Sequence, residues 1–211
     1  MSAESASGAA EAEFSTRDRL IADAVALAAR GGISHLSLRR LAGELGTSHR
    51  MLIYHFGSRD GVTAEIVRVV EEQQRAALQD LLADDDLPPL EQARRFWDPV
   101  VAAAGSFGPL FFELTGQALQ GRPHAVRLLD GLVDTWLEPL AALYERLGIS
   151  AEQAPVHARL GLAAARGLLL DLLVTGDRAG VDAANELLGR MVLADVAATS
   201  DRPNSCYCNK G

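Results

Sequence analysis

Cysteine and aromatic residues are both scarce in this chain of 211 residues. Two residues are cysteine and 5% are aromatic. The cysteines, Cys206 and Cys208, form a lone CxC in a polar tail without a nearby His, so they cannot complete a four-ligand zinc site. β-Branched residues are also sparse, and no long stretch alternates apolar and polar residues, which argues against an extended sheet. The abundance of alanine and leucine predicts an all-α protein instead.

Long hydrophobic runs and enzyme motifs are absent as well. No run of eighteen apolar residues exists, and the N-terminus lacks the basic and apolar regions of a secretory signal, so we expect a cytoplasmic protein. The sequence has no GxGxxG, GxxxxGK, GxSxG or HExxH motif, and His124 and His157 have no evident partner in it. We predict no cofactor and no metal. An all-α enzyme remains a minor alternative, because paired carboxylates can meet only in the fold.

The charge is unevenly distributed along the chain. The formal net charge is −8, yet residues 14–60 hold seven arginines against four acidic residues, a local charge of +3. A basic module on an acidic body can still bind DNA, because charges are screened over ~8 Å at physiological salt. The asymmetry therefore points to nucleic acid as a partner of this segment.

Residues 33–59 have the pattern of two short helices joined by a tight turn. Ser37 can cap the first helix, Gly46 can end it in a left-handed conformation, and Ser48 can cap the second. The first helix has an apolar face formed by Leu38, Leu41, Ala42 and Leu45. The spacing predicts a helix-turn-helix, whose second helix enters the major groove while the first crosses the backbone. Arg39 and Arg40 would then face phosphate.

An ordinary helical hairpin would share part of this pattern. The outward face of the second helix, however, carries Arg and His but no acid, which favours DNA binding. We expect a disordered tail over residues 1–14, a DNA-binding domain over 15–60, a helical domain over 61–198 and a second disordered tail over 199–211. Within these domains we predict helices at 59–82, 89–104, 106–119, 123–147, 152–175 and 179–198.

Three helices, a glycine turn, a YHF ending and a long connecting helix together resemble the tetracycline-repressor (TetR) family of transcription regulators. The resemblance is close over residues 15–70 and one of layout beyond them. It implies an all-helical, dimeric repressor whose C-terminal domain binds a small molecule. The predicted contacts to double-stranded DNA are Ser37, Arg39, Arg40, Ser48, His49, Arg50, Met51, Ile53, Tyr54, His55 and Arg59.

Two of these positions differ from the family pattern, and a third keeps its positive charge. The family commonly has Tyr where this chain has Ile53, and a small residue where it has Arg50, so base preferences do not carry over. Arg59 stands where the family has a basic residue, usually Lys, that meets a phosphate.

The helix expected over 152–175 is apolar nearly all round, and the one over 179–198 is apolar on one face. A helix of the first kind must be buried on more than one side. Two such helices per subunit can build a four-helix dimer interface, although an intramolecular core is the alternative. The predicted interface residues are Gly161, Ala165, Leu169, Leu172, Leu188 and Met191.

Seven aromatic residues fall within residues 96–144. They are Phe96, Trp97, Phe107, Phe111, Phe112, Trp136 and Tyr144. On the rings alone, a simple domain core is an equal interpretation. The resemblance implies a ligand cavity among these helices, and the few charges nearby suit a small apolar effector. The alternative is a DNA-binding protein that has no effector.

Overall fold

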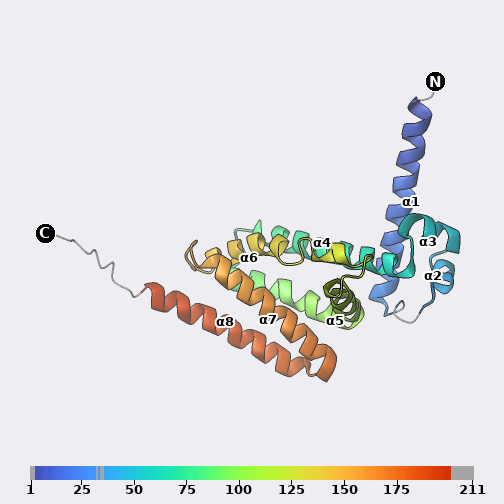
Figure 1. The fold of residues 1–211 in the computed structure, drawn as a ribbon. Helices are drawn as coiled ribbons and strands as arrows, with labels where there is room; N and C mark the ends of the chain where they lie inside the picture. Colours follow the sequence, from blue (N-terminus) through green and yellow to red (C-terminus); the bar gives the residue numbers. More distant parts are fainter. Residues whose placement is uncertain (1–2, 32, 34–35, 201–211) are drawn as a thin grey trace. The chain divides into compact units, whose positions relative to one another are not determined.

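The protein is helical throughout the part that the structure, a computed structural model, describes: residues 3–31, 33 and 36–200, with side chains from Thr16 to Ala198 (Figure 1). The α-helices are α1 (Ala3–Ala29), α2 (Leu38–Glu44), α3 (His49–Phe56), α4 (Arg59–Leu82), α5 (Pro89–Leu119), α6 (Asp134–Arg146), α7 (Ala154–Thr175) and α8 (Arg178–Ser200). A short 3-10 helix, η1, spans Val126–Leu129. The predicted all-α fold with an N-terminal helix-turn-helix is confirmed. None of the described helices is long and apolar enough to cross a membrane.

The chain divides into two compact units. The first comprises Met1–Leu78 and Asp98–Leu132, and the second comprises Gln79–Trp97 and Val133–Gly211. Helices α4 and α5 therefore each contribute to both units. The predicted boundary at residue 60 separates the DNA-binding segment from the rest of the chain, whereas these units are defined by compactness. That boundary therefore stays a prediction.

The core of the first unit joins all five of its α-helices. Leu52 of α3 and Ile66 of α4 are completely buried, and the same cluster includes Ala24 of α1, Leu41 of α2 and Leu114 of α5. The helix-turn-helix is thus anchored by apolar side chains at helical spacing, as its sequence pattern indicates.

The turns of the helix-turn-helix follow from local chemistry. Ser37 Oγ accepts a hydrogen bond from the Arg40 amide at 3.4 Å, and Ser48 Oγ accepts one from the Met51 amide at 3.1 Å. Gly46 and Gly57 have φ angles of 62° and 74°, which glycine adopts without strain. The predicted caps and the predicted glycine turn at Gly46 are confirmed.

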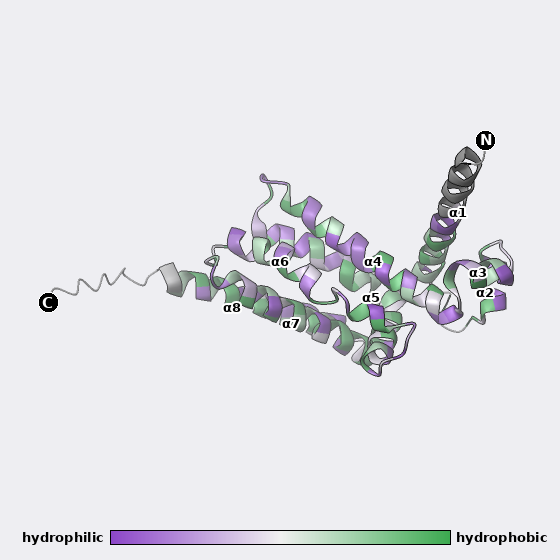
Figure 2. Ribbon diagram, turned by 45° about the horizontal axis from the view of Figure 1, so that its top comes forward, coloured by the Kyte–Doolittle hydropathy of each residue, from purple (hydrophilic) through white to green (hydrophobic). Residues whose placement is uncertain are grey.

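The second unit contains the antiparallel helices α6, α7 and α8. Its core cluster includes Tyr144, Ile149, Ala154, Ala158 and Val192. Green apolar turns alternate with purple polar ones along these helices, as expected of amphipathic elements (Figure 2). The helices are bounded by turns at Gly148 and Gly176, whose positive φ angles confirm the predicted breaks there.

Two predicted helix boundaries are wrong. Helix α5 is continuous from Pro89 to Leu119, so the predicted break at Gly105 does not occur. The helix continues through it because Val101, Ala104, Leu110 and Leu114 are buried along one face. Conversely, no single helix covers the predicted range 123–147. Gly131, with a φ of 83°, lies between η1 and the start of α6 at Asp134.

Helical backbone extends into both predicted tails. Helix α1 begins at Ala3, so the backbone of residues 3–14 is helical where the sequence predicts a disordered tail. Alanine and glutamate in this segment have high helix propensities, which the prediction undervalued. Helix α8 extends to Ser200, two residues into the predicted tail of 199–211; residues 201–211, with both cysteines, lie outside the described residues.

Candidate nucleic-acid interface

Helix α3 presents one exposed face with cationic and aromatic side chains. His49 and Arg50 are exposed, and one turn later Ile53 and Tyr54 are 41% and 65% exposed. Leu52, on the opposite face, is completely buried. The apolar face therefore fixes which side chains α3 offers to a partner. The eight residues of α3 include no acid, so this face would not repel a phosphate backbone.

Helix α2 adds two more exposed cations to the same module. Arg39 and Arg40 are both exposed, while Leu41 and Ala42 are buried against the core. Ser37 and Ser48 serve first as helix caps, and their hydroxyl protons stay available as donors. These positions suit the orienting contacts to phosphate that such motifs make.

Three predicted DNA contacts are less accessible than the sequence suggests. Met51 and His55 are half-buried, and the His55 Nε2 atom is buried without a hydrogen-bond partner among the described residues. The centroids of the His55 and Tyr54 rings lie 5.0 Å apart, in an edge-on arrangement. Arg59 is also half-buried, and its Nε donates to the Leu36 carbonyl at 2.8 Å. Fewer side chains are therefore fully exposed for DNA contact than the sequence predicts.

A charged contact that the sequence does not reveal connects three helices of this module. Arg17 of α1 donates through Nη2 to Glu65 Oε1 of α4 at 2.7 Å, and its guanidinium lies 5.4 Å from the centroid of the Phe56 ring of α3. Arg68 also bonds Glu65, at 2.7 Å. Burial alone would raise the pKa of Glu65, but hydrogen bonds from Arg68 and Arg17 outweigh it and lower the pKa. The contact braces α3 from its inner side.

The seven predicted ligand-contacting rings are divided between the two compact units. Phe96, Trp97, Trp136 and Tyr144 belong to the second unit, and Phe107, Phe111 and Phe112 to the first. In the second unit the Phe96 and Trp136 ring centroids lie 6.0 Å apart, and Trp97 Nε1 donates to Asp182 Oδ1 at 3.4 Å. The seven rings therefore do not all belong to one compact unit.

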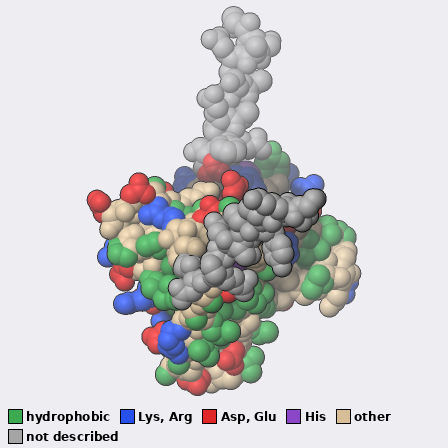
Figure 3. All heavy atoms as spheres, turned by 90° about the vertical axis from the view of Figure 1, so that its left-hand side faces the viewer, with side chains coloured by type: hydrophobic (Ala, Val, Ile, Leu, Met, Phe, Trp, Pro, Cys, Tyr) green, Lys and Arg blue, Asp and Glu red, His purple; other side chains and the backbone are tan. Residues whose placement is uncertain are grey.

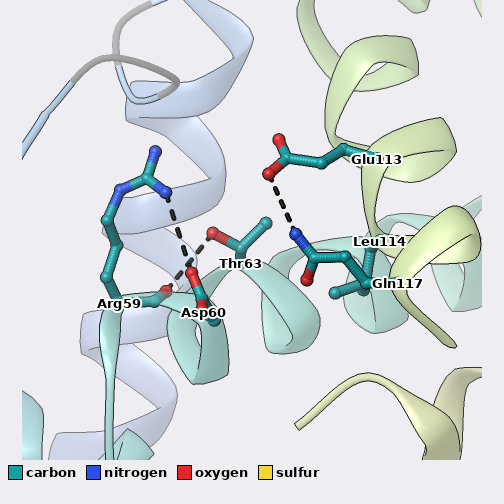
Figure 4. Close-up of a pocket in the computed structure, with 6 residues that line it drawn as sticks. All are labelled: Arg59, Asp60, Thr63, Glu113, Leu114 and Gln117. Atoms are coloured by element: carbon teal, nitrogen blue, oxygen red, sulfur yellow. Dashed lines mark hydrogen bonds and ion pairs between the residues drawn. The ribbon is translucent and has the colours of Figure 1, made fainter. Parts of the chain in front are cut away.

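A small pocket lies between α4 and α5 in the first unit (Figure 4). Its lining residues are Arg59, Asp60, Thr63, Glu113, Leu114 and Gln117. Five of its six lining residues are polar or charged and none is one of the seven rings, so it is not the aromatic cavity that the sequence predicts.

The predicted dimer residues lie on α7 and α8 of the second unit. Met191 is 61% exposed, and Ala165, Leu169, Leu172 and Leu188 are half-buried. Gly161, in contrast, faces the Tyr144 hydroxyl of the same subunit so closely that a Cβ atom would overlap with it. Other large apolar side chains of these helices are open to solvent, including Val174 at 78%. Figure 3 shows apolar side chains exposed between charged ones on one face of the molecule.

Comparison with known proteins agrees with this geometry. Residues 20–66 match the family model described as bacterial regulatory proteins, tetR family. The fold is similar to that of a TetR transcriptional regulator from Legionella pneumophila, with 18% identity over 83% of this chain and 96% of that one, at a TM-score of 0.61. It is also similar to NalD, the secondary repressor of the MexAB-OprM multidrug efflux pump in Pseudomonas aeruginosa, with 19% identity over 86% and 96% of the two chains and a TM-score of 0.50. No curated protein matches the sequence.

The capped α2–α3 pair, its buried inner face and its exposed basic outer face define a DNA-binding transcription regulator of the helix-turn-helix class. The match over residues 20–66 assigns this N-terminal segment, which includes α2 and α3, to the tetR family of bacterial regulatory proteins.

Proposed function

We propose that the protein is a ligand-responsive repressor that binds a roughly palindromic operator as a homodimer. The observation that supports DNA binding is the exposed face of α3. This face consists of His49, Arg50, Ile53 and Tyr54 and contains no acidic residue. One such helix per subunit and twofold symmetry require an operator with two related half-sites. NalD, a repressor with a similar fold, supports repression as the mode of action.

Substitution of Arg50 tests this assignment. The wild-type protein would first select its preferred sequence from random double-stranded DNA, and affinity would then be measured against that duplex and a scrambled one. Arg50→Ala should cost ~1–3 kcal/mol on the selected duplex and relax the preference at one base pair per half-site. Arg94, whose side chain is 74% exposed on α5 outside the helix-turn-helix, provides the control, because Arg94→Ala should bind like wild type. Equal affinities of the wild type for selected and scrambled DNA would contradict the proposal.

The proposed effector is a small apolar or aromatic molecule bound in the second unit. Support comes from the family and from the Phe96 and Trp136 rings, whose centroids lie 6.0 Å apart. Trp97 directly follows Phe96 in the sequence. A ligand can change operator affinity only through its differential affinity for the two states, typically ~1–3 kcal/mol. Hydrophobic compounds that quench Trp97 and Trp136 fluorescence should therefore weaken operator binding. If such binders never change operator affinity, the effector-independent alternative is favoured.

A further inference from the structure

Arg59 is the first residue of α4, and its guanidinium points back towards the segment that joins α1 to α2. Its Nε donates to the Leu36 carbonyl at 2.8 Å, and its Nη2 donates to the Ile33 carbonyl at 3.4 Å. These contacts cross 23 and 26 positions of sequence. One side chain thus connects the start of α4 to the entrance of the helix-turn-helix.

The two carbonyls that Arg59 contacts belong to a turn that leads into α2. The Leu36 amide donates to the Ile33 carbonyl at 3.1 Å, and Ser37 immediately caps α2. Ile33 and Leu36 are only 5% and 9% exposed, so both residues are fixed against the core. The Ile33 carbonyl would keep the Leu36 amide as a donor without Arg59, whereas the partly buried Leu36 carbonyl would lose a charged donor, which forms a stronger bond than a neutral one.

The Arg59 guanidinium also lies near Asp60, the next residue of α4 (Figure 4). Arg59 Nη1 lies 3.8 Å from Asp60 Oδ1, and Asp60 Oδ2 lies 3.8 Å from His124 Nε2. His124 Nε2 is in turn 2.6 Å from Gln117 Oε1. The Gln117 amide nitrogen donates to Glu113 Oε1 at 3.0 Å, so its oxygen must accept from His124.

We propose that Arg59 is a positioning residue of the DNA-binding domain rather than a phosphate contact. By holding the Ile33–Leu36 turn, it fixes where α2 begins, and α2 packs directly on the reading helix α3. The proposal rests on DNA binding by α3. It replaces the phosphate role that the family resemblance implies for this position.

Substitution of Arg59 by lysine distinguishes a phosphate contact from a positioning role. A lysine keeps the positive charge, so it would preserve a phosphate contact, but its single ammonium cannot reproduce the fork that reaches two carbonyls. Arg59→Lys should therefore behave like wild type if Arg59 binds phosphate, and like Arg59→Ala if Arg59 positions the turn. Arg40→Ala is the matched control for the measurement without DNA, because Arg40 is exposed on α2 with its side chain away from the core.

The first measurement needs no DNA. Amide hydrogen exchange of the full-length chain, followed by NMR, should be about tenfold faster at Leu36 and Leu41 in both Arg59 variants, because a net hydrogen bond to a charged group is lost. Exchange within α7 should not change, and Arg40→Ala should leave Leu36 protected. Unchanged exchange at Leu36 and Leu41 in Arg59→Ala would overturn the proposal. If the alanine variant does not fold, Arg59→Lys alone decides the outcome.

The second measurement uses the duplex selected by the wild-type protein. Each phosphate contact contributes ~0.9 to the slope of log affinity against log salt concentration. A positioning role predicts about tenfold weaker binding for both Arg59 variants with the wild-type slope. A slope lowered by ~0.9 in Arg59→Ala and restored in Arg59→Lys would show a phosphate contact instead. Failure of the wild type to prefer its selected duplex would refute the proposed function, whereas the exchange result would stand by itself.

Discussion

Gly161 is the residue of α7 whose lack of a side chain has a clear structural cause. A Cβ atom there would overlap with the Tyr144 hydroxyl, and the ring atoms Cζ and Cε2 would lie 3.1 and 3.3 Å away. Around Gly167, six residues later on the same helix, a Cβ atom would meet nothing within 4 Å. Packing against a neighbouring side chain therefore requires glycine at position 161 but not at position 167.

We predict opposite effects of alanine at these two glycines. Gly161→Ala should lower the free energy of unfolding by ~1–3 kcal/mol, because the added methyl overpacks the α6–α7 contact. Gly167→Ala should leave stability unchanged or raise it by up to ~1 kcal/mol, because alanine favours the helix. Urea unfolding followed by circular dichroism measures both changes.

Tyr144 provides the control for this pair. Tyr144→Phe removes the hydroxyl that overlaps with the added methyl, so Gly161→Ala should cost less in that background. The remaining ring contacts are tight, so the recovery should be partial. An additive double mutant would show that Tyr144 is not the cause of the cost.

At the scale of helices, α1 and α4 are joined by the ion pair between Arg17 and Glu65. Hydrogen bonds from Arg68 and Arg17 lower the pKa of Glu65 despite burial, which acts in the opposite direction. A carboxyl group whose pKa is lower in the folded state stabilises the fold above its unfolded pKa of ~4.3, and this contribution is lost as the pH falls through the folded pKa. The contact is therefore a source of acid sensitivity.

We predict that Glu65→Gln destabilises the protein at pH 7 and that the difference from wild type disappears in acid. The measurement is the free energy of unfolding in urea from pH 7 to pH 3. Glu72, which is paired with Arg68 but has a side chain 50% exposed, provides the control. Glu72→Gln should have a smaller effect, because exposed ion pairs contribute little. A constant difference between Glu65→Gln and wild type across the pH range would show that ionisation of Glu65 is not involved.

The elements differ in how far their local sequence determines them. Helices α2 and α3 were predictable because Ser37, Gly46 and Ser48 act on the residues next to them. The continuity of α5 through Gly105 was not predictable, because it depends on burial of one helix face in the fold. Tertiary packing overrides local propensity in such cases.

The candidate site shows the same limit. The exposed position of Arg50 follows from the helical spacing around Leu52, so it could be predicted. The bonds from Arg59 to the Ile33–Leu36 turn and from Arg17 to Glu65 join positions far apart in the sequence. A single sequence contains no signal for such pairs, because their side chains meet only after the helices have packed.

At the scale of the whole molecule, α7 and α8 retain apolar side chains that their own subunit leaves open. Val174 and Met191 are 78% and 61% exposed. Apolar area of this kind is stabilised by a partner surface, and the proposed twofold homodimer would supply it. Binding of two half-sites by one molecule would in turn depend on that association.

We predict that Met191→Arg converts the dimer into a folded monomer. Within the subunit the new side chain would be exposed, so circular dichroism and urea unfolding should match those of the wild type. In the dimer its charge would be desolvated without a partner, which opposes association. Leu119→Arg is the control, because Leu119 is 74% exposed on α5, outside the proposed interface. Sedimentation equilibrium at micromolar concentration should find wild type and Leu119→Arg dimeric and Met191→Arg monomeric, with weaker operator binding by the monomer. A monomeric wild type would contradict the homodimer, and a dimeric Met191→Arg would place the interface on another surface.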